Sequence, residues 1–168
     1  FGSLQFVITG AEKLRPAIAE AFERHFGLPL IEGYGSTECS PVVTMSTQDF
    51  RGAGFRQSGA KRGTVGHPIP GVTVRVVDLK TGEELPPIEP GMLLVRGPNV
   101  MGGYYKMPEK TAEVLQDGWY VTGDVARIDE DGFVTITDRL SRFSKIGGEM
   151  IPHLNIEEAL HQVTGIEE

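Results

Sequence analysis

The chain has 168 residues, of which 39% are apolar and 23% charged, with a formal net charge of −7. This composition supports a sizeable folded core and excludes a disordered polyelectrolyte. The acidic balance argues against nonspecific binding of nucleic acid or anionic lipid, because both need a basic surface. No apolar run approaches the roughly 20 residues that cross a bilayer, so we predict no membrane segment and no nucleic-acid partner.

The single cysteine, Cys39, excludes an intrachain disulfide and a thiolate-rich zinc site. We therefore expect a reducing, cytoplasmic setting. The sequence starts at Phe1 without an initiator Met or a signal-like segment, and we interpret it as a piece of a longer protein.

The first elements predict a strand, a helix and a second strand. Residues 4–8 form a strand-like apolar run, and from Leu14 to Phe26 apolar residues recur at helical spacing until Gly27. Residues 30–32 form the next strand-like run. A strand–helix–strand unit of this length favours a parallel crossover, in which ligands bind at the carboxyl ends of the strands.

The second half has a different pattern. Residues 49–62 contain three glycines and few apolar side chains, which predicts a mobile surface loop. From residue 63, short alternating strands separated by turn residues predict a small antiparallel barrel or sandwich, and Ile156 begins a further helix. We predict three parts: an α/β nucleotide-binding piece with its loop (1–62), a β-barrel with a ribose-binding loop (63–138), and a hinge with the start of a small domain (139–168).

Residues 33–38, with the sequence GYGSTE, give the strongest local signal. Gly33 and Gly35 let a backbone approach a ligand, and Tyr34 offers a flat face for a purine. Thr37 offers a hydroxyl to phosphate, and Glu38 a hard oxygen suited to Mg²⁺. A glycine-rich turn with an exposed tyrosine explains the same residues about equally well.

Three weaker signals extend this candidate site. Gly10, Ala11 and Glu12 follow the first strand as GYGSTE follows the second, so both segments are expected at one edge of the sheet. Asp124 follows a glycine turn and could accept hydrogen bonds from a ribose diol, although ordinary turn chemistry is the more frequent explanation. Arg139, Arg142 and Lys145 form a basic cluster that could meet ribose or phosphate, or could simply be solvated.

Several other motifs are rejected. Residues 129–132 (DEDG) lack the later acid of a calcium loop and predict a hairpin turn. The four histidines show no metal-ligand spacing, and Cys39 has no paired base nearby, so a small buried residue is expected there. The absence of a lysine-containing phosphate loop excludes ordinary kinases and GTPases.

In order along the chain, GYGSTE, residues 120–124 (YVTGD) and residues 138–149 (DRLSRFSKIGGE) resemble the adenylate-forming superfamily of acyl-CoA synthetases, adenylation domains and luciferases. Residues 66–71 and 91–97 resemble its barrel segments, so the likeness covers almost the whole chain. The implied fold class is α/β plus β: the C-terminal part of the large domain, with a parallel strand–helix–strand piece followed by a small antiparallel β-barrel that ends just past the hinge.

The resemblance also implies roles for individual residues. Tyr34 stacks on adenine, Thr37 contacts the α-phosphate, Glu38 holds Mg²⁺, and Asp124 and Arg139 hold the ribose hydroxyls of ATP or AMP. Thr37 and Glu38 would be the catalytic residues. The nucleotide site would be completed by Gly10, Ala11, Glu12, Gly33, Gly35 and Ser36, the hinge by Ser141, and the tunnel for the acceptor thiol by Gly147 and Gly148.

A narrower likeness concerns residues 138–151, where Asp138, Ser141 and Arg142 depart from the common pattern. This segment resembles the bifunctional 2-acylglycerophosphoethanolamine acyltransferase/acyl-[acyl-carrier-protein] synthetase group. It implies a long-chain fatty acid substrate, acyl carrier protein as thiol acceptor, and a full-length protein at the cytoplasmic face of the inner membrane that supplies lysophospholipid acylation.

Alternatives stay open. The acceptor could be CoA, the enzyme could be a fatty acid–CoA ligase or an amino-acid adenylation domain, or the chain could be a noncatalytic nucleotide-binding module. The resemblance places a phosphate-gripping loop before Phe1 and a catalytic lysine after Glu168, so we expect this isolated chain to be inactive.

Overall fold

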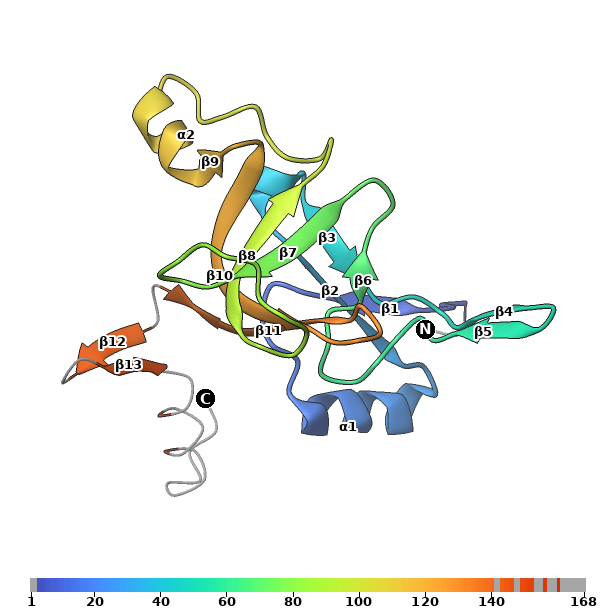
Figure 1. Cartoon of the computed structure of the whole chain (residues 1–168). Coiled ribbons are helices and arrows are strands. Elements are labelled where there is room, and N and C mark those ends of the chain that lie inside the picture. Colours follow the sequence, from blue (N-terminus) through green and yellow to red (C-terminus); the bar gives the residue numbers. More distant parts are fainter. Residues whose placement is uncertain (1–2, 141–142, 147–148, 153–155, 157–159, 161–168) are drawn as a thin grey trace.

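The first sheet contains the parallel unit predicted at the start of the chain. The computed structural model describes residues 3–140, 143–146, 149–152, 156 and 160 (Figure 1). Strands β1 and β2 run parallel with Ile8 opposite Ile31, and β3 and β6 extend the sheet in antiparallel fashion. The order is β1-β2-β3-β6, spanning Val7–Thr9, Leu30–Gly35, Val42–Met45 and His67–Pro68.

Helix α1 (Pro16–Phe26) connects β1 to β2 and confirms the predicted strand–helix–strand order. It begins two residues later than the apolar spacing predicts, because Arg15 precedes a proline and is held in an extended conformation. At its other end Gly27 is left-handed (φ 69°), and its N–H donates to the Glu23 carbonyl at 2.8 Å, which ends the helix.

The second sheet is antiparallel and curved, in the order β11-β10-β8-β7, as predicted for the second half (Figure 1). Helix α2 (Pro108–Val114) and the short β9 precede its longest strand, β10. The turn at residues 129–132 joins β10 to β11, as predicted. The strands span Thr73–Val77 (β7), Gly91–Arg96 (β8), Leu115–Gln116 (β9), Trp119–Ile128 (β10) and Val134–Arg139 (β11).

One core is shared by the two sheets. Cys39 and Val43, from the first half of the chain, are buried in the same cluster as Leu93, Val95 and Val134 from the second. The predicted boundary at residue 62 stays a prediction, but the apolar packing on its two sides is continuous.

Four predicted segments differ in the structure. β1 begins at Val7 rather than residue 4, and β2 continues through Gly35 because β3 pairs with it, placing Tyr34 opposite Thr44. The glycine turn predicted before Asp124 is instead a left-handed Gly123 inside β10. The loop predicted at 49–62 contains a hairpin, β4 (Phe50–Gly52) and β5 (Phe55–Gln57), whose turn consists of Ala53 and Gly54.

Near the C-terminus, β12 (Phe143–Ile146) pairs with β13 (Glu149–Pro152), and Ile156 and Leu160 are helical. The predicted hinge residue Ser141 and the predicted tunnel residues Gly147 and Gly148 lie outside the described residues. Within the described part of the chain, neither helix has the length and apolar character needed to cross a bilayer.

Candidate functional site

Tyr34 and Asp124 lie 90 residues apart in the sequence and meet in space. The Tyr34 hydroxyl donates a 2.6 Å hydrogen bond to Asp124 Oδ2. Burial, together with the adjacent Asp124 carboxylate, raises the pKa of Tyr34 far above its ordinary value. The hydroxyl is therefore a donor throughout the physiological pH range.

Asp124 is held by the local backbone of β10. Gly123 is left-handed (φ 76°), and the pairing of β10 with β8 is interrupted between Val121 and Val125. Within this bulge the Thr122 hydroxyl donates to the Leu93 carbonyl at 2.9 Å and accepts from the Asp124 N–H at 3.0 Å. A bulge redirects a side chain out of the regular strand pattern, and here it turns the carboxylate toward Tyr34.

Arg139 completes a three-residue group with Tyr34 and Asp124. Its Nε lies 2.8 Å from Asp124 Oδ1, and the two residues are direct partners in the β10–β11 ladder. The Asp124 side chain is 6% exposed, whereas that of Arg139 is 57% exposed. The acid is thus buried and held from both sides, while much of the guanidinium stays available to solvent or a ligand.

Glu38 lies in the short 3₁₀ helix Thr37–Cys39 that follows β2. The Tyr104 hydroxyl donates to Glu38 Oε1 at 2.9 Å, and the Met101 N–H donates to the Glu38 carbonyl at 2.7 Å. A hydrogen bond from its own backbone N–H, followed by the one from Tyr104, lowers the pKa of Glu38. Glu38 therefore carries an ionised carboxylate whose orientation is fixed by the Tyr104 hydrogen bond.

Glu38 could hold a magnesium ion only together with the phosphates of a nucleotide. Among the described residues no group of three or more His, Cys, Asp or Glu side chains could form an all-protein metal cage. Mg²⁺ in nucleotide enzymes is usually held by one or two carboxylates, with phosphate and water completing the octahedron. A single ionised glutamate agrees with that arrangement.

The glycines of GYGSTE have a structural reason that the sequence did not reveal. A Cβ added at Gly35 would lie 1.8 Å from the Pro41 carbonyl oxygen, and one at Gly33 would lie 3.2 Å from the Thr44 oxygen. Gly35 is required because the chain that leads into β3 returns directly against β2, whereas a Cβ at Gly33 would make only a tight contact. The predicted approach of a ligand to this backbone is not needed to explain them.

Of the other predicted residues, Gly10 lies against the backbone of β2, and Ser36 and Thr37 follow the end of this strand. A Cβ on Gly10 would lie 3.2 Å from the Gly33 carbonyl oxygen, so the segment after β1 does meet the segment of Tyr34. Ala11 is left-handed (φ 74°), and Glu12 is exposed, with no ion pair or hydrogen bond to another described residue. Ser36 is extended before the 3₁₀ helix, and Thr37 is exposed at its start.

Sequence reasoning missed three residues that organise this site: Tyr104, Thr122 and Asn99. The Asn99 amide donates to the carbonyls of Cys39 (3.0 Å) and Val42 (2.7 Å), which fixes the turn between the 3₁₀ helix and β3. Tyr104 is 66 residues from Glu38, so no local spacing could identify it. Cys39 is fully buried and its pKa is raised by burial, which confirms the expected packing role.

Comparison with known proteins identifies the family. The profile of the AMP-binding enzyme family matches residues 1–105. The chain belongs to this family. The match covers GYGSTE and the barrel segments up to Tyr105, and it therefore confirms the resemblance to the adenylate-forming superfamily.

Relatives and solved structures agree with this AMP-binding assignment. The chain is 40% identical to a long-chain-fatty-acid–CoA ligase of Yersinia pestis over 163 residues, covering 96% of this chain and 27% of the relative. It is 38% identical to a Bacillus subtilis protein of the same name, covering 99% of this chain and 28% of that one. ATP-bound MatB from Rhodopseudomonas palustris superposes with a TM-score of 0.81 and 35% identity, over 95% of this chain and 30% of that chain.

The chain therefore spans a little over a quarter of the length of these two curated relatives. Both are named as CoA ligases. The narrower resemblance of residues 138–151 to an acyl-carrier-protein synthetase stays a prediction, as do the individual roles of the site residues.

Proposed function

We propose that this AMP-binding chain forms part of the nucleotide site of an ATP-dependent ligase that activates a fatty acid. In the first step a carboxylate oxygen bonds to the α-phosphorus of ATP, and the bond to pyrophosphate breaks. In the second step a thiol sulfur bonds to the acyl carbon, and AMP leaves. The observation that carries the proposal is the group formed by Tyr34, Asp124 and Arg139.

The geometry of this group suits a ribose. Each carboxylate oxygen can accept more than one hydrogen bond, so Asp124 keeps acceptor capacity beyond its bonds to Tyr34 and Arg139. A vicinal diol would use that capacity, while the exposed part of the Arg139 guanidinium donates to the same sugar. The Tyr34 ring, anchored through its hydroxyl, would offer its face to the adenine.

Thr37 and Glu38 would act where negative charge develops. Attack of a carboxylate on the α-phosphorus concentrates charge on its oxygens, and fixed donors lower the barrier by stabilising that charge. Glu38 would hold Mg²⁺, which supplies charge neutralisation at the phosphates when bound. The Tyr104 hydrogen bond keeps the Glu38 carboxylate oriented for this task.

For the acceptor we propose acyl carrier protein, with the acyl group passing on to a lysophospholipid. The support is the resemblance of residues 138–151, whereas the names of the matched relatives support CoA. Both acceptors present a phosphopantetheine thiol, so the chemistry of the second step is the same.

The test is fatty-acid-dependent exchange of pyrophosphate into ATP by the full-length protein that carries this chain. Asp124→Asn should weaken ATP binding roughly 10- to 150-fold, because hydrogen bonds to a charged group contribute about 1.5–3 kcal/mol. Asp117→Asn, which removes the same charge from an exposed turn, is the matched control and should bind ATP normally. Equal ATP affinity in the two variants would exclude Asp124 from the site, and absence of exchange in the wild type would refute the ligase.

A second measurement addresses the acceptor. The adenylate is formed first, and CoA and acyl carrier protein are then offered separately at equal thiol concentration. Preferential consumption of acyl carrier protein is expected, and preferential consumption of CoA would contradict this part of the proposal.

A further inference from the structure

Residues 97–107, the segment between β8 and α2, contact Glu38 at both its backbone and its carboxylate. The Met101 N–H donates to the Glu38 carbonyl, and the Tyr104 hydroxyl donates to Glu38 Oε1. The Asn99 amide binds the turn that follows Glu38. The position of the carboxylate therefore depends on whatever holds segment 97–107 in place.

Thr111 of α2 holds this segment through its hydroxyl. The Tyr104 N–H donates to Thr111 Oγ1 at 2.9 Å, and the same hydroxyl donates to the Met107 carbonyl at 2.9 Å. A threonine hydroxyl has one proton and two lone pairs, so it can make both bonds at once. The bond to Met107 is a common contact within a helix, whereas the bond from Tyr104 fixes the residue that reaches Glu38.

The backbone between Tyr104 and α2 follows an unusual path that brings it against Thr111. Gly103 has a φ of 138°, and a Cβ there would lie 2.8 Å from Thr111 Cγ2 and 3.0 Å from its Oγ1. Lys106 is left-handed (φ 55°), which is uncommon for a residue other than glycine. Close packing at Gly103 and the hydrogen bond to the Tyr104 N–H thus involve the same threonine.

The burial pattern of α2 gives Thr111 a firm support. Thr111 and Val114 are partly buried, and the other five residues of the helix are exposed. Val114 packs against the core cluster that contains Tyr120 of β10, and α2 lies beside the start of that strand (Figure 1). A helix of seven residues is not stable alone in water, so Val114 ties α2 to the core while Thr111 faces segment 97–107.

We propose that Thr111 is a positioning residue for the magnesium ion of a bound nucleotide: it holds Tyr104, and Tyr104 holds the Glu38 carboxylate in the orientation that the metal requires. This inference rests on the proposed role of Glu38 and adds α2 to the site. Residues that orient a metal ligand contribute roughly 10- to 100-fold to metal affinity. A merely structural role of Thr111 would lower stability but would leave the metal dependence of nucleotide binding unchanged.

The test is calorimetric titration of ATP into the full-length protein that carries this chain, once with Mg²⁺ and once with EDTA. No fatty acid is added, so the readout is equilibrium binding. The quantity compared is the factor by which Mg²⁺ strengthens ATP binding. Glu38→Gln should remove most of this factor, Tyr104→Phe should lower it on the order of tenfold, and Thr111→Val about two- to tenfold.

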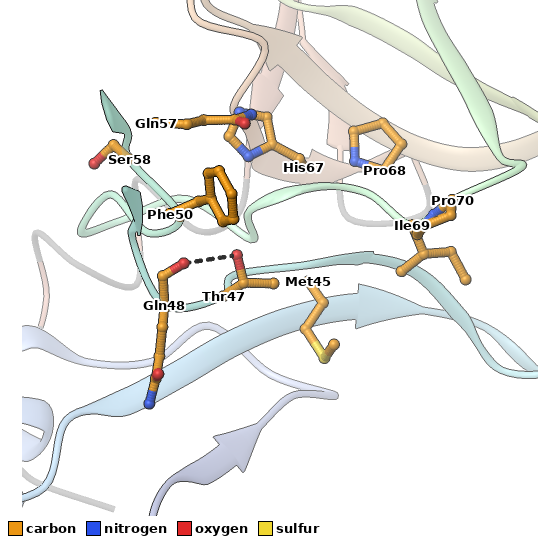
Figure 2. A pocket seen from close by; sticks show the side chains of 11 residues that line it. Met45, Thr47, Gln48, Phe50, Gln57, Ser58, His67, Pro68, Ile69 and Pro70 are labelled. Carbon is orange, nitrogen blue, oxygen red and sulfur yellow. Dashed lines mark hydrogen bonds between the residues drawn. The ribbon is translucent and has the colours of Figure 1, made fainter. Parts of the chain in front are cut away.

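Two control variants keep the test specific. Thr111→Ser retains the hydroxyl and should keep the wild-type factor. Thr47→Val removes a hydroxyl from a threonine that lines a cavity of about 230 Å³ beside the β4–β5 hairpin, where it donates to the Gln48 carbonyl at 3.4 Å (Figure 2). Thr47 follows the end of β3 that lies opposite Gly33, outside the contacts of Glu38, so this variant should also keep the factor.

A double-mutant cycle tests the order of the contacts. Because Thr111 is proposed to act through Tyr104, Thr111→Val should have little further effect on the magnesium factor in a Tyr104→Phe background. Fully additive effects of the two changes would show that they act independently and would contradict the proposal.

The failure of this inference can be told apart from the failure of the proposed function. A wild-type factor in Glu38→Gln would remove Glu38 from the metal site, and the role of Thr111 with it. A reduced factor in Glu38→Gln together with a wild-type factor in Thr111→Val would refute the inference alone. It would also be refuted by an equal loss of ATP affinity with Mg²⁺ and with EDTA in Thr111→Val, or by a loss in Thr111→Ser as large as in Thr111→Val.

Discussion

Replacing Tyr34 with Phe tests the contact at the centre of the candidate site. The change removes only the hydroxyl that donates to Asp124 Oδ2 at 2.6 Å, and it leaves the bond from Arg139 to the other oxygen in place. Asp124 is 4% exposed, so water can only partly replace the lost donor. A hydrogen bond to a charged group contributes about 1.5–3 kcal/mol, and this amount should be lost from the free energy of unfolding.

The assay is urea unfolding of the 168-residue chain, followed by the fluorescence of Trp119. This residue is the only tryptophan in the chain and lies in the same strand as Asp124. The loss corresponds to a decrease in Tm of about 3–12 °C for a protein of this size. The slope m should not change, because the surface exposed on unfolding is nearly the same.

Tyr105→Phe is the matched control, since that tyrosine is 85% exposed, and it should change the free energy of unfolding by less than about 0.5 kcal/mol. A double-mutant cycle with Asp124→Ala then isolates the pair. Equal stability of Tyr34→Phe and the wild type, or additive effects in the cycle, would refute the reasoning.

Two further predictions concern stability. Gly35→Ala should destabilise the chain by about 1–3 kcal/mol in the same assay, because its Cβ would lie 1.8 Å from the Pro41 oxygen. Gly102→Ala is the control, since a Cβ there would have no neighbour within 4 Å, and it should be close to neutral. Similar losses of stability in the two variants would contradict the packing argument. Burial raises the pKa of Tyr34 and raises that of Tyr120 to about 12, so the folded chain retains protons that the unfolded chain releases above pH about 10. The contribution of these two tyrosines to stability should therefore be constant up to about pH 9 and fall as the pH rises further, so that the fall is shallower in Tyr34→Phe; an equal slope in both proteins would contradict the pKa shift of Tyr34.

Sequence reasoning located elements whose signals are local. The β1–α1–β2 unit, the left-handed Gly27 and the hairpin turn at 129–132 follow from apolar spacing and turn residues within a few positions. The predicted ends of helices and strands were less accurate. β2 continues through Gly35 because β3 pairs with it, and no pattern in residues 30–35 contains that information.

In the candidate site, too, local motifs could be predicted and contacts between distant parts of the sequence could not. GYGSTE is contiguous and could be recognised directly, but the pairing of Tyr34 with Asp124 depends on two sheets meeting across 90 residues. In the sequence, only the resemblance to a family assigns these two positions to one nucleotide site. Tyr104 had no such signal, because its role comes from the path of the chain that leads to α2.

The register of β10 and β11 has a mechanical consequence. Arg139 is the last residue of β11, and its guanidinium holds the Asp124 carboxylate directly across the ladder. A displacement of Arg139 would therefore act on Asp124 both through the guanidinium and through the pairing of the two strands. If Asp124 binds a ribose as proposed, a change at the end of β11 would alter the ribose site, and a bound ribose would in turn help to hold the end of β11.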